Sequence, residues 1–108
     1  MLINIIETDA EAVVKLKGEL DYNSYKNFEE KIIGIIETGT KRVIIEMSEL
    51  IHIDSMGLGT LTKLWRMADE EGGLLVLVGV PSNIEKMIKL VNLDGRIGIF
   101  ATEEEAKK

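Results

Sequence analysis

The chain has 108 residues, 45% hydrophobic and 30% charged, a balance typical of one soluble globular domain and not of a disordered segment. A formal net charge of −6 argues against a nucleic-acid-binding surface, because phosphate contacts need clustered lysine and arginine. The lack of cysteine excludes disulfides and cysteine-based metal sites or catalysis. No signal-peptide pattern and no membrane-spanning apolar run is present, so we expect a cytoplasmic protein with no membrane partner.

A hairpin and a helix are predicted for the first part of the chain. Short β-rich runs over 2–6 and 12–16 flank a polar connection of hairpin length, so we expect two antiparallel strands. Apolar residues then recur at helical spacing at Tyr25, Phe28, Ile32 and Ile35. Asp21 or Asn23 is predicted to cap the start of this helix, and Gly39 to end it.

Strands and helices alternate over the rest of the chain. We predict buried strands over 42–47 and 74–80 and a last strand over 96–100. The helix between the first two strands has one apolar face, formed by Leu58, Leu61, Trp65 and Ala68. A third helix follows Pro81, with capping-box spacing between Ser82 and Glu85 and an apolar stripe of Ile84, Met87, Ile88 and Val91.

Thr102 and Glu105 repeat the capping-box spacing before a short charged helix, and we expect 103–108 to form a solvated face. The whole chain, 1–108, is thus predicted to be one α/β domain: an opening antiparallel hairpin, then a largely parallel sheet with alternating helices, in the order β-β-α-β-α-β-α-β-α. The turns after Leu20, Ile53 and Val80 are expected to cluster at one edge of the sheet.

Ser55 lies where a predicted strand feeds the start of a helix. This corner exposes its hydroxyl, and the unpaired N–H groups of a helix start tolerate an added phosphate. A simpler interpretation is that Asp54 or Ser55 only caps the helix, as these residue types commonly do. However, Gly57 and Gly59 fall in the first helical turn, where each costs about 1 kcal/mol relative to alanine unless a close contact requires it.

These residues carry a family resemblance. The segment Asp54-Ser-Met-Gly-Leu-Gly59, with Gly18-Glu-Leu-Asp21 upstream, resembles the STAS domain of bacterial anti-sigma factor antagonists. Residues 43–54 resemble the third strand of that family and its lead into the switch loop, and 90–100 resemble its closing helix-to-strand segment. Met56 departs from the family pattern, which usually has a small residue at this position, and this departure concerns the fit of a partner more than phosphorylation.

The resemblance implies a single STAS domain and a protein-interaction switch without enzymatic activity, cofactor or metal. Unphosphorylated, such a protein docks an anti-sigma factor of the serine-kinase type and frees the sigma factor. The kinase then phosphorylates Ser55 to end the interaction, and a phosphoserine phosphatase reverses this. The partner-binding residues implied are Asp21, Asn23, Asp54, Ser55, Met56 and Gly57.

Other functions remain as alternatives. The same loop in a ligand- or nucleotide-sensing, or transporter-associated, STAS module would act without phosphorylation. The segment from Gly57 to Gly59 is not a standard nucleotide loop, because Thr62 stands where the third glycine is required. A hydrolase using Ser55 and His52 has no sign of the required geometry, and a lone histidine is more often structural or solvent-facing than a metal ligand.

Overall fold

The computed structural model describes residues 1–107 and contains one five-stranded sheet with the order β1-β2-β3-β4-β5. The strands are β1 (Leu2–Glu7), β2 (Glu11–Leu20), β3 (Arg42–Ile53), β4 (Leu74–Val78) and β5 (Gly98–Phe100). The helices are α1 (Tyr25–Glu37), α2 (Ser55–Glu70), α3 (Ser82–Leu90), the 3-10 turn η1 (Leu93–Gly95) and α4 (Glu103–Ala106). β1 pairs with β2 in antiparallel orientation and the other pairs are parallel, which confirms the predicted architecture.

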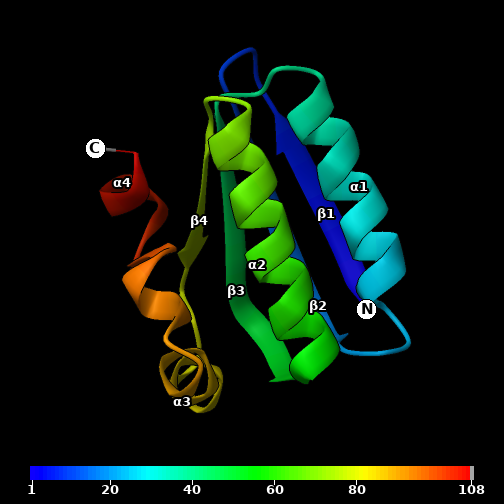
Figure 1. The fold of residues 1–108 in the computed structure, drawn as a ribbon, viewed down its shortest axis with the longest axis vertical. Helices are drawn as coiled ribbons and strands as arrows, with labels where there is room; N and C mark the ends of the chain where they lie inside the picture. The colour runs from blue at the N-terminus through cyan, green and yellow to red at the C-terminus, as the bar shows by residue number, and fades with distance from the viewer. Residues whose placement is uncertain (108) are drawn as a thin grey trace.

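The two faces of the sheet are covered unequally. Helices α1 and α2 lie side by side on one face (Figure 1), where they and α3 enclose the main core. On the other face, Ala106 of α4 packs with the strand residues Val13, Ile44, Val76 and Val78. The prediction of a solvated tail over 103–108 was therefore wrong for Ala106, which is buried, and Lys108 lies outside the described residues. A single helical turn is enough to bury one small side chain there.

Strand β3 is longer than the buried run predicted for it and positions the site. Its first half lies between β2 and β4, and its second half pairs with β2 alone, up to the pair Leu20–Ile53. The turns after β2 and β3 therefore lie next to each other. β4 pairs only up to Glu46 of β3 and ends before Gly79, whose φ of +64° turns the chain. The segment after Val80 still reaches the same edge, as predicted, because the side-chain amide of Asn83 donates to the carbonyl of Ile51 at 3.3 Å.

Three predictions about helix ends also need correction. Ser24, not Asp21 or Asn23, is the N-cap of α1, because the chain first closes a turn in which the carbonyl of Asp21 accepts from the N–H groups of Ser24 and Tyr25. Pro81 is the N-cap of α3 and makes no side-chain cap, since Ser82 is already helical. Val91 is the C-cap of α3 and is exposed rather than part of the buried stripe.

Candidate functional site

Asp54 joins two segments at the carboxyl end of β3. It is the N-cap of α2, and its Oδ1 accepts a hydrogen bond from the N–H of Gly57 at 3.0 Å. Its Oδ2 accepts from the N–H of Tyr22, in the loop between β2 and α1, also at 3.0 Å. Its own N–H donates to the carbonyl of Leu20 at 3.3 Å. One residue therefore starts the helix and holds the neighbouring loop against it.

These contacts keep the Asp54 carboxylate ionised. The N–H of Gly57 lowers the pKa of Asp54 below its usual 3.8, and the N–H groups of Tyr22 and Met56 act in the same direction. Partial burial opposes this by raising the pKa, and the electrostatic influence of the nearby His52 ring lowers it further. The net direction is downward, so at neutral pH this edge of the molecule carries a fixed negative charge beside Ser55.

Ser55 is the first residue of α2 and is exposed. Its hydroxyl makes no hydrogen bond to any part of the chain that the structure describes, since Asp54 supplies the helix cap. The side chain lies at a groove of about 310 Å³ between the first turns of α2 and the segment after α3. The groove is lined by Ser55, Leu58, Gly59, Thr62, Val91, Asn92, Leu93 and Arg96. The hydroxyl is therefore free to react or to contact a partner.

Asp21 and Asn23 lie in the loop that Asp54 holds. Oδ1 of Asp21 accepts from the N–H of Asn23 at 3.0 Å and from Oγ of Ser24 at 3.3 Å. The Ser24 hydroxyl also donates to the carbonyl of Glu19 at 2.7 Å. The carboxylate of Asp21 therefore orders its own turn, and Asn23 remains exposed. The structure thus brings the loop with Asp21 and Asn23 next to Asp54 and Ser55, as the sequence predicted.

Gly57 and Gly59, the two glycines of α2, are present for different structural reasons. A Cβ on Gly57 would lie 2.5 Å from the carbonyl oxygen of Leu20 and 2.7 Å from a side-chain carbon of Ile53. Packing within this chain therefore requires Gly57, and no partner is needed to explain it. A Cβ on Gly59 would meet nothing within 4 Å. Gly59 is thus the glycine whose open surface is unexplained by the chain itself.

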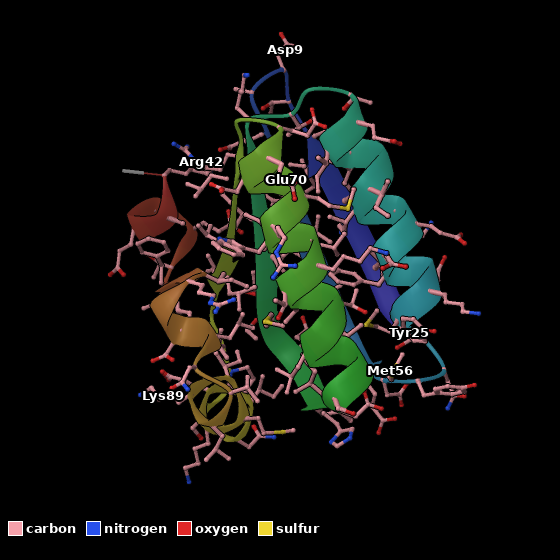
Figure 2. The ribbon with its side chains drawn as sticks, in the orientation of Figure 1. Asp9, Tyr25, Arg42, Met56, Glu70 and Lys89 are labelled. Atoms are coloured by element: carbon pink, nitrogen blue, oxygen red, sulfur yellow. The ribbon has the colours of Figure 1, made fainter. Side chains whose placement is uncertain are left out.

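Exposed apolar side chains surround this polar centre. Tyr22 is 71% exposed, Ile51 68%, Met56 36%, Leu90 82% and Val91 56%. Val91 lines the groove of Ser55, and Ile51 lines a second hollow together with Asp21 and Asn23. Figure 2 labels Met56 at the start of α2 and Tyr25 at the start of α1, at the same end of the molecule. We call Tyr22, Ile51, Met56, Leu90 and Val91 the apolar rim.

The sequence prediction included only Met56 of the apolar rim. Val91 and Leu90 appeared to continue a helix, and Ile51 lay in an apolar run leading to the turn. The one usable signal was Tyr22, an aromatic residue between the polar residues Asp21 and Asn23 in a predicted turn. Exposed apolar residues that gather from separate elements are typical of protein-interaction surfaces.

The structure gives His52 no catalytic geometry. His52 is exposed, and no hydrogen bond joins it to Ser55 among the described residues. Both oxygens of Asp54 are occupied by backbone N–H groups. Within residues 1–107, no three histidine, aspartate or glutamate side chains gather in a way that could hold a metal ion. In the same residues, no helix combines the length and apolar character needed to cross a membrane.

A comparison of the sequence with models of known protein families identifies the family of this chain. The model of the STAS domain matches residues 3–106, almost the whole chain. This chain is a STAS domain protein. The resemblance inferred from the segments around Gly18 and Ser55 is thus confirmed.

Several relatives of this STAS domain protein are anti-sigma factor antagonists. It is 24% identical over 102 residues to the anti-sigma-B factor antagonist of Bacillus subtilis, covering 94% of this chain and 93% of the relative. It is also 28% identical over 71 residues to a Thermotoga maritima protein described as a candidate anti-sigma factor antagonist. That match covers 66% of this chain and about 63% of the relative's length.

Solved structures agree with this relationship. The unphosphorylated anti-sigma factor antagonist SpoIIAA superposes with a TM-score of 0.77 at 26% identity, covering 97% of this chain and 94% of SpoIIAA. The Thermotoga maritima structure superposes with a TM-score of 0.91 at 23% identity, covering 97% and 91% of the two chains. Transporter proteins contain the same fold at lower identity, which shows the fold alone. Homology therefore supports the general role of an anti-sigma factor antagonist.

Proposed function

We propose that this STAS domain protein is a non-enzymatic anti-sigma factor antagonist controlled by phosphorylation of Ser55. In its unphosphorylated form it binds an anti-sigma factor of the serine-kinase type in the cytoplasm and releases the sigma factor. The observation that carries the proposal is the free, exposed Ser55 hydroxyl in the centre of an apolar rim. The names of the relatives support an anti-sigma factor as the partner, and its serine-kinase type is part of the proposal.

The proposed footprint combines a polar centre with the apolar rim. It includes Asp21, Asn23, Asp54, Ser55, Met56 and Gly57. Asp54 acts mainly by holding the loop and the helix start in place, since backbone N–H groups occupy both of its oxygens, whereas only Oδ1 of Asp21 accepts hydrogen bonds from the described chain. Exposed apolar area around polar anchors is the usual composition of a protein interface. The partner is therefore expected to present an apolar patch with donors for the central acidic residues.

Phosphorylation would change the charge of this surface without requiring a change of shape. A phosphate adds about −1.5 to −2 charge at neutral pH. It would lie beside the carboxylate of Asp54, whose pKa is lowered and which therefore stays ionised. Docking must remove water from both charges, and like charges in a desolvated interface are costly. Release of the anti-sigma factor follows, and a phosphoserine phosphatase restores binding.

Mass spectrometry after incubation with the serine-kinase anti-sigma factor and ATP tests the modification. We expect one phosphate, located on Ser55, and none on a Ser55→Ala variant. Ser24 and Ser48 are natural internal controls, because the hydroxyl of each already donates to a backbone or side-chain oxygen. Ser82→Ala is a matched variant at another exposed helix start and should be modified like wild type. Phosphate that persists in Ser55→Ala would contradict the assignment.

Calorimetric titration with the same partner tests the switch. Ser55→Ala should bind about as tightly as wild type, because the interface stays neutral at this position. Ser55→Asp should bind more than about tenfold more weakly, because it adds a second carboxylate next to Asp54. If Ser55→Asp binds normally and no kinase modifies Ser55, the alternative of a ligand-sensing or transporter-associated module takes precedence. The groove beside Ser55 is then the place to look for the ligand.

A further inference from the structure

The outer edge of β1 is unpaired. β1 lies at one end of the sheet and pairs only with β2. No other backbone hydrogen bond within residues 1–107 involves Leu2–Glu7. The hairpin closes with the N–H of Thr8 donating to the carbonyl of Glu11 at 2.9 Å, and bonding alternates along an antiparallel pair. The N–H and C=O groups of Ile3, Ile5 and Glu7 therefore point outward from the sheet.

This edge lacks the usual protection against strand pairing. Natural edge strands carry lysine, proline or a bulge that prevents another strand from adding to them. The strand Leu2–Glu7 has no lysine, proline or bulge, its ladder with β2 has no register shift, and its single charged residue, Glu7, stands at its last position. Leu2 is 68% exposed and Ile6 is 54% exposed, both on the sheet face opposite α1 and α2. Neither residue belongs to the apolar rim around Ser55, and the proposed function does not use them.

We propose that β1 pairs with β1 of a second copy of this chain, forming a continuous ten-stranded sheet around a two-fold axis. Successive side chains of a strand alternate between the two faces of a sheet. Residues that face each other across the two β1 strands must therefore lie on the same face, which limits the possible registers. Centring the axis on Asn4 places Leu2 opposite Ile6 of the partner subunit, twice, and Ile3 opposite Ile5 of the partner subunit, twice. Shifting the axis to Ile3 or Ile5 replaces apolar pairs with Asn4 or Glu7. The sequence of β1 is thus self-complementary in one register.

A glycine in α1 supports the same arrangement. Glu29 forms an ion pair with Lys63 of α2 at 2.9 Å, which identifies the side of α1 that faces α2. Gly34 follows five residues later, a rotation of about 140°, so it lies on the side turned away from α2. Figure 1 shows α1 on the β1 side of α2, and Gly34 lies about 200° around the helix from the buried Ile32, so it faces solvent on the side of the free edge. A Cβ on Gly34 would meet nothing within 4 Å, and nothing in the chain explains this poor helix former.

The two-fold axis would be perpendicular to the sheet, so α1 of both copies would lie on the same face and approach each other. A residue without a side chain at this point lets two helix backbones come close. The missing side chain at Gly34 leaves room for this approach. A single pair of short strands forms a small interface, so the dimer is expected to be weak and to depend on concentration.

Engineered cysteines test the register directly, because the chain contains no cysteine. Asn4 would face Asn4 of the partner subunit at a non-hydrogen-bonded position, where Cα atoms lie about 4.5 Å apart and a disulfide fits. Asn4→Cys should therefore give a covalent dimer under mild oxidation. Leu74→Cys, at another exposed strand position, is the matched control and should stay monomeric. Equal cross-linking of the two variants would overturn the proposal.

Two further measurements distinguish specific pairing of β1 strands from cross-links that form by chance collision. Leu2→Cys and Ile6→Cys should each cross-link poorly alone and efficiently when mixed, because these positions face each other only between copies. Sedimentation equilibrium of the unmodified chain should show reversible dimers. Ile6→Lys should abolish them and leave the circular dichroism spectrum unchanged, since Ile6 is exposed in the monomer. An unmodified chain that stays monomeric up to about 1 mM, or a mixture that cross-links no better than either variant alone, would overturn the proposal.

Discussion

At the turn between β3 and α2, a single carboxylate accepts from two backbone N–H groups that are 35 positions apart in the chain, those of Tyr22 and Gly57. Removing an N-cap carboxylate costs about 1 to 2 kcal/mol. We therefore expect Asp54→Ala to lower the free energy of unfolding by at least that amount, because the loop contact is lost as well. Ser55→Ala should change it by less than about 0.5 kcal/mol, since Ser55 caps nothing.

Urea unfolding of both variants checks this contrast. The difference matters for function, because Ser55→Ala can then be used in binding experiments without a stability correction. A Ser55→Ala variant destabilised by about 1 kcal/mol or more would mean that the serine hydroxyl has a structural partner after all. The sequence alone could not show whether Asp54 or Ser55 is the N-cap of α2. Aspartate and serine are both good caps, and the answer depends on which residue first adopts helical backbone angles.

The lowered pKa of Asp54 predicts a pH dependence of stability. A carboxyl group with a lower pKa in the folded chain than in the unfolded chain stabilises the fold above the unfolded pKa. For Asp54 this contribution is fully present above about pH 4, starting from the usual value of 3.8, and is lost as the pH falls through the lower folded value. Asp54→Asn keeps a capping side chain but cannot titrate.

Wild type should therefore be more stable than Asp54→Asn at pH 7, and the difference should shrink below about pH 4. Denaturant midpoints measured for both proteins across this range provide the test. Glu104→Gln is a suitable control, because Glu104 is exposed and its side chain accepts no hydrogen bond from the described part of the chain. A difference that stays constant from pH 7 to pH 3 would show that the charge of Asp54 contributes nothing.

At the scale of the helix, the two glycines of α2 predict opposite outcomes. Gly57→Ala would push a Cβ against the carbonyl of Leu20, so it should destabilise the fold by about 1 to 3 kcal/mol. Gly59→Ala places the methyl group in open space and should stabilise the helix by up to about 1 kcal/mol. Thermal unfolding measures both.

The affinity of the Gly59→Ala variant for the anti-sigma factor tests whether Gly59 contributes to the interface. If the partner approaches the groove beside Ser55, Gly59→Ala should weaken binding while raising the melting temperature. Leu74→Ala, a truncation on the other face of the sheet, serves as the control for non-specific effects. Unchanged binding by Gly59→Ala would place the partner away from the groove and leave this glycine without a function.

The elements were predictable because each has a strong local pattern. The apolar spacing in α1 and the continuous apolar run of β4 are set by burial, and both were placed within a few residues. The second half of β3 was not predicted as strand, because its alternation is broken by exposed Ile51 and by register shifts against β2. Pairing with β2 over a long distance in sequence, rather than local pattern, makes it a strand.

The candidate site was predictable in part for the same reason. Asp54, Ser55 and the glycines lie within one short motif, and parallel strands bring Asp21 to the same edge. Most of the apolar rim was not predictable, because its members come from four separate segments, and Ile51, Leu90 and Val91 look like ordinary core residues in sequence. Val91 illustrates this: the helix ends one residue earlier than its apolar spacing suggests, and the side chain becomes exposed.

At the scale of the whole molecule, the charge predicts which macromolecules do not bind. With a net charge of −6, the chain should show no binding to DNA or RNA at physiological salt. A mobility-shift assay with both nucleic acids at micromolar protein tests this, with the salt concentration varied. A shift that weakens as salt increases would indicate phosphate contacts and would contradict the expectation.

The double contact of Asp54 also determines how the edge of the molecule can move. The loop before α1 and the first turn of α2 are bonded to the two oxygens of one carboxylate, so any displacement of the Asp54 side chain breaks both contacts together. The amide hydrogens of Tyr22 and Gly57 therefore belong to one cooperative opening unit, although they lie far apart in the chain. A partner that binds the loop before α1 or the first turn of α2 therefore finds the two segments in a fixed relative position. Recognition at this edge then needs little induced fit, and the entropy lost on binding stays small.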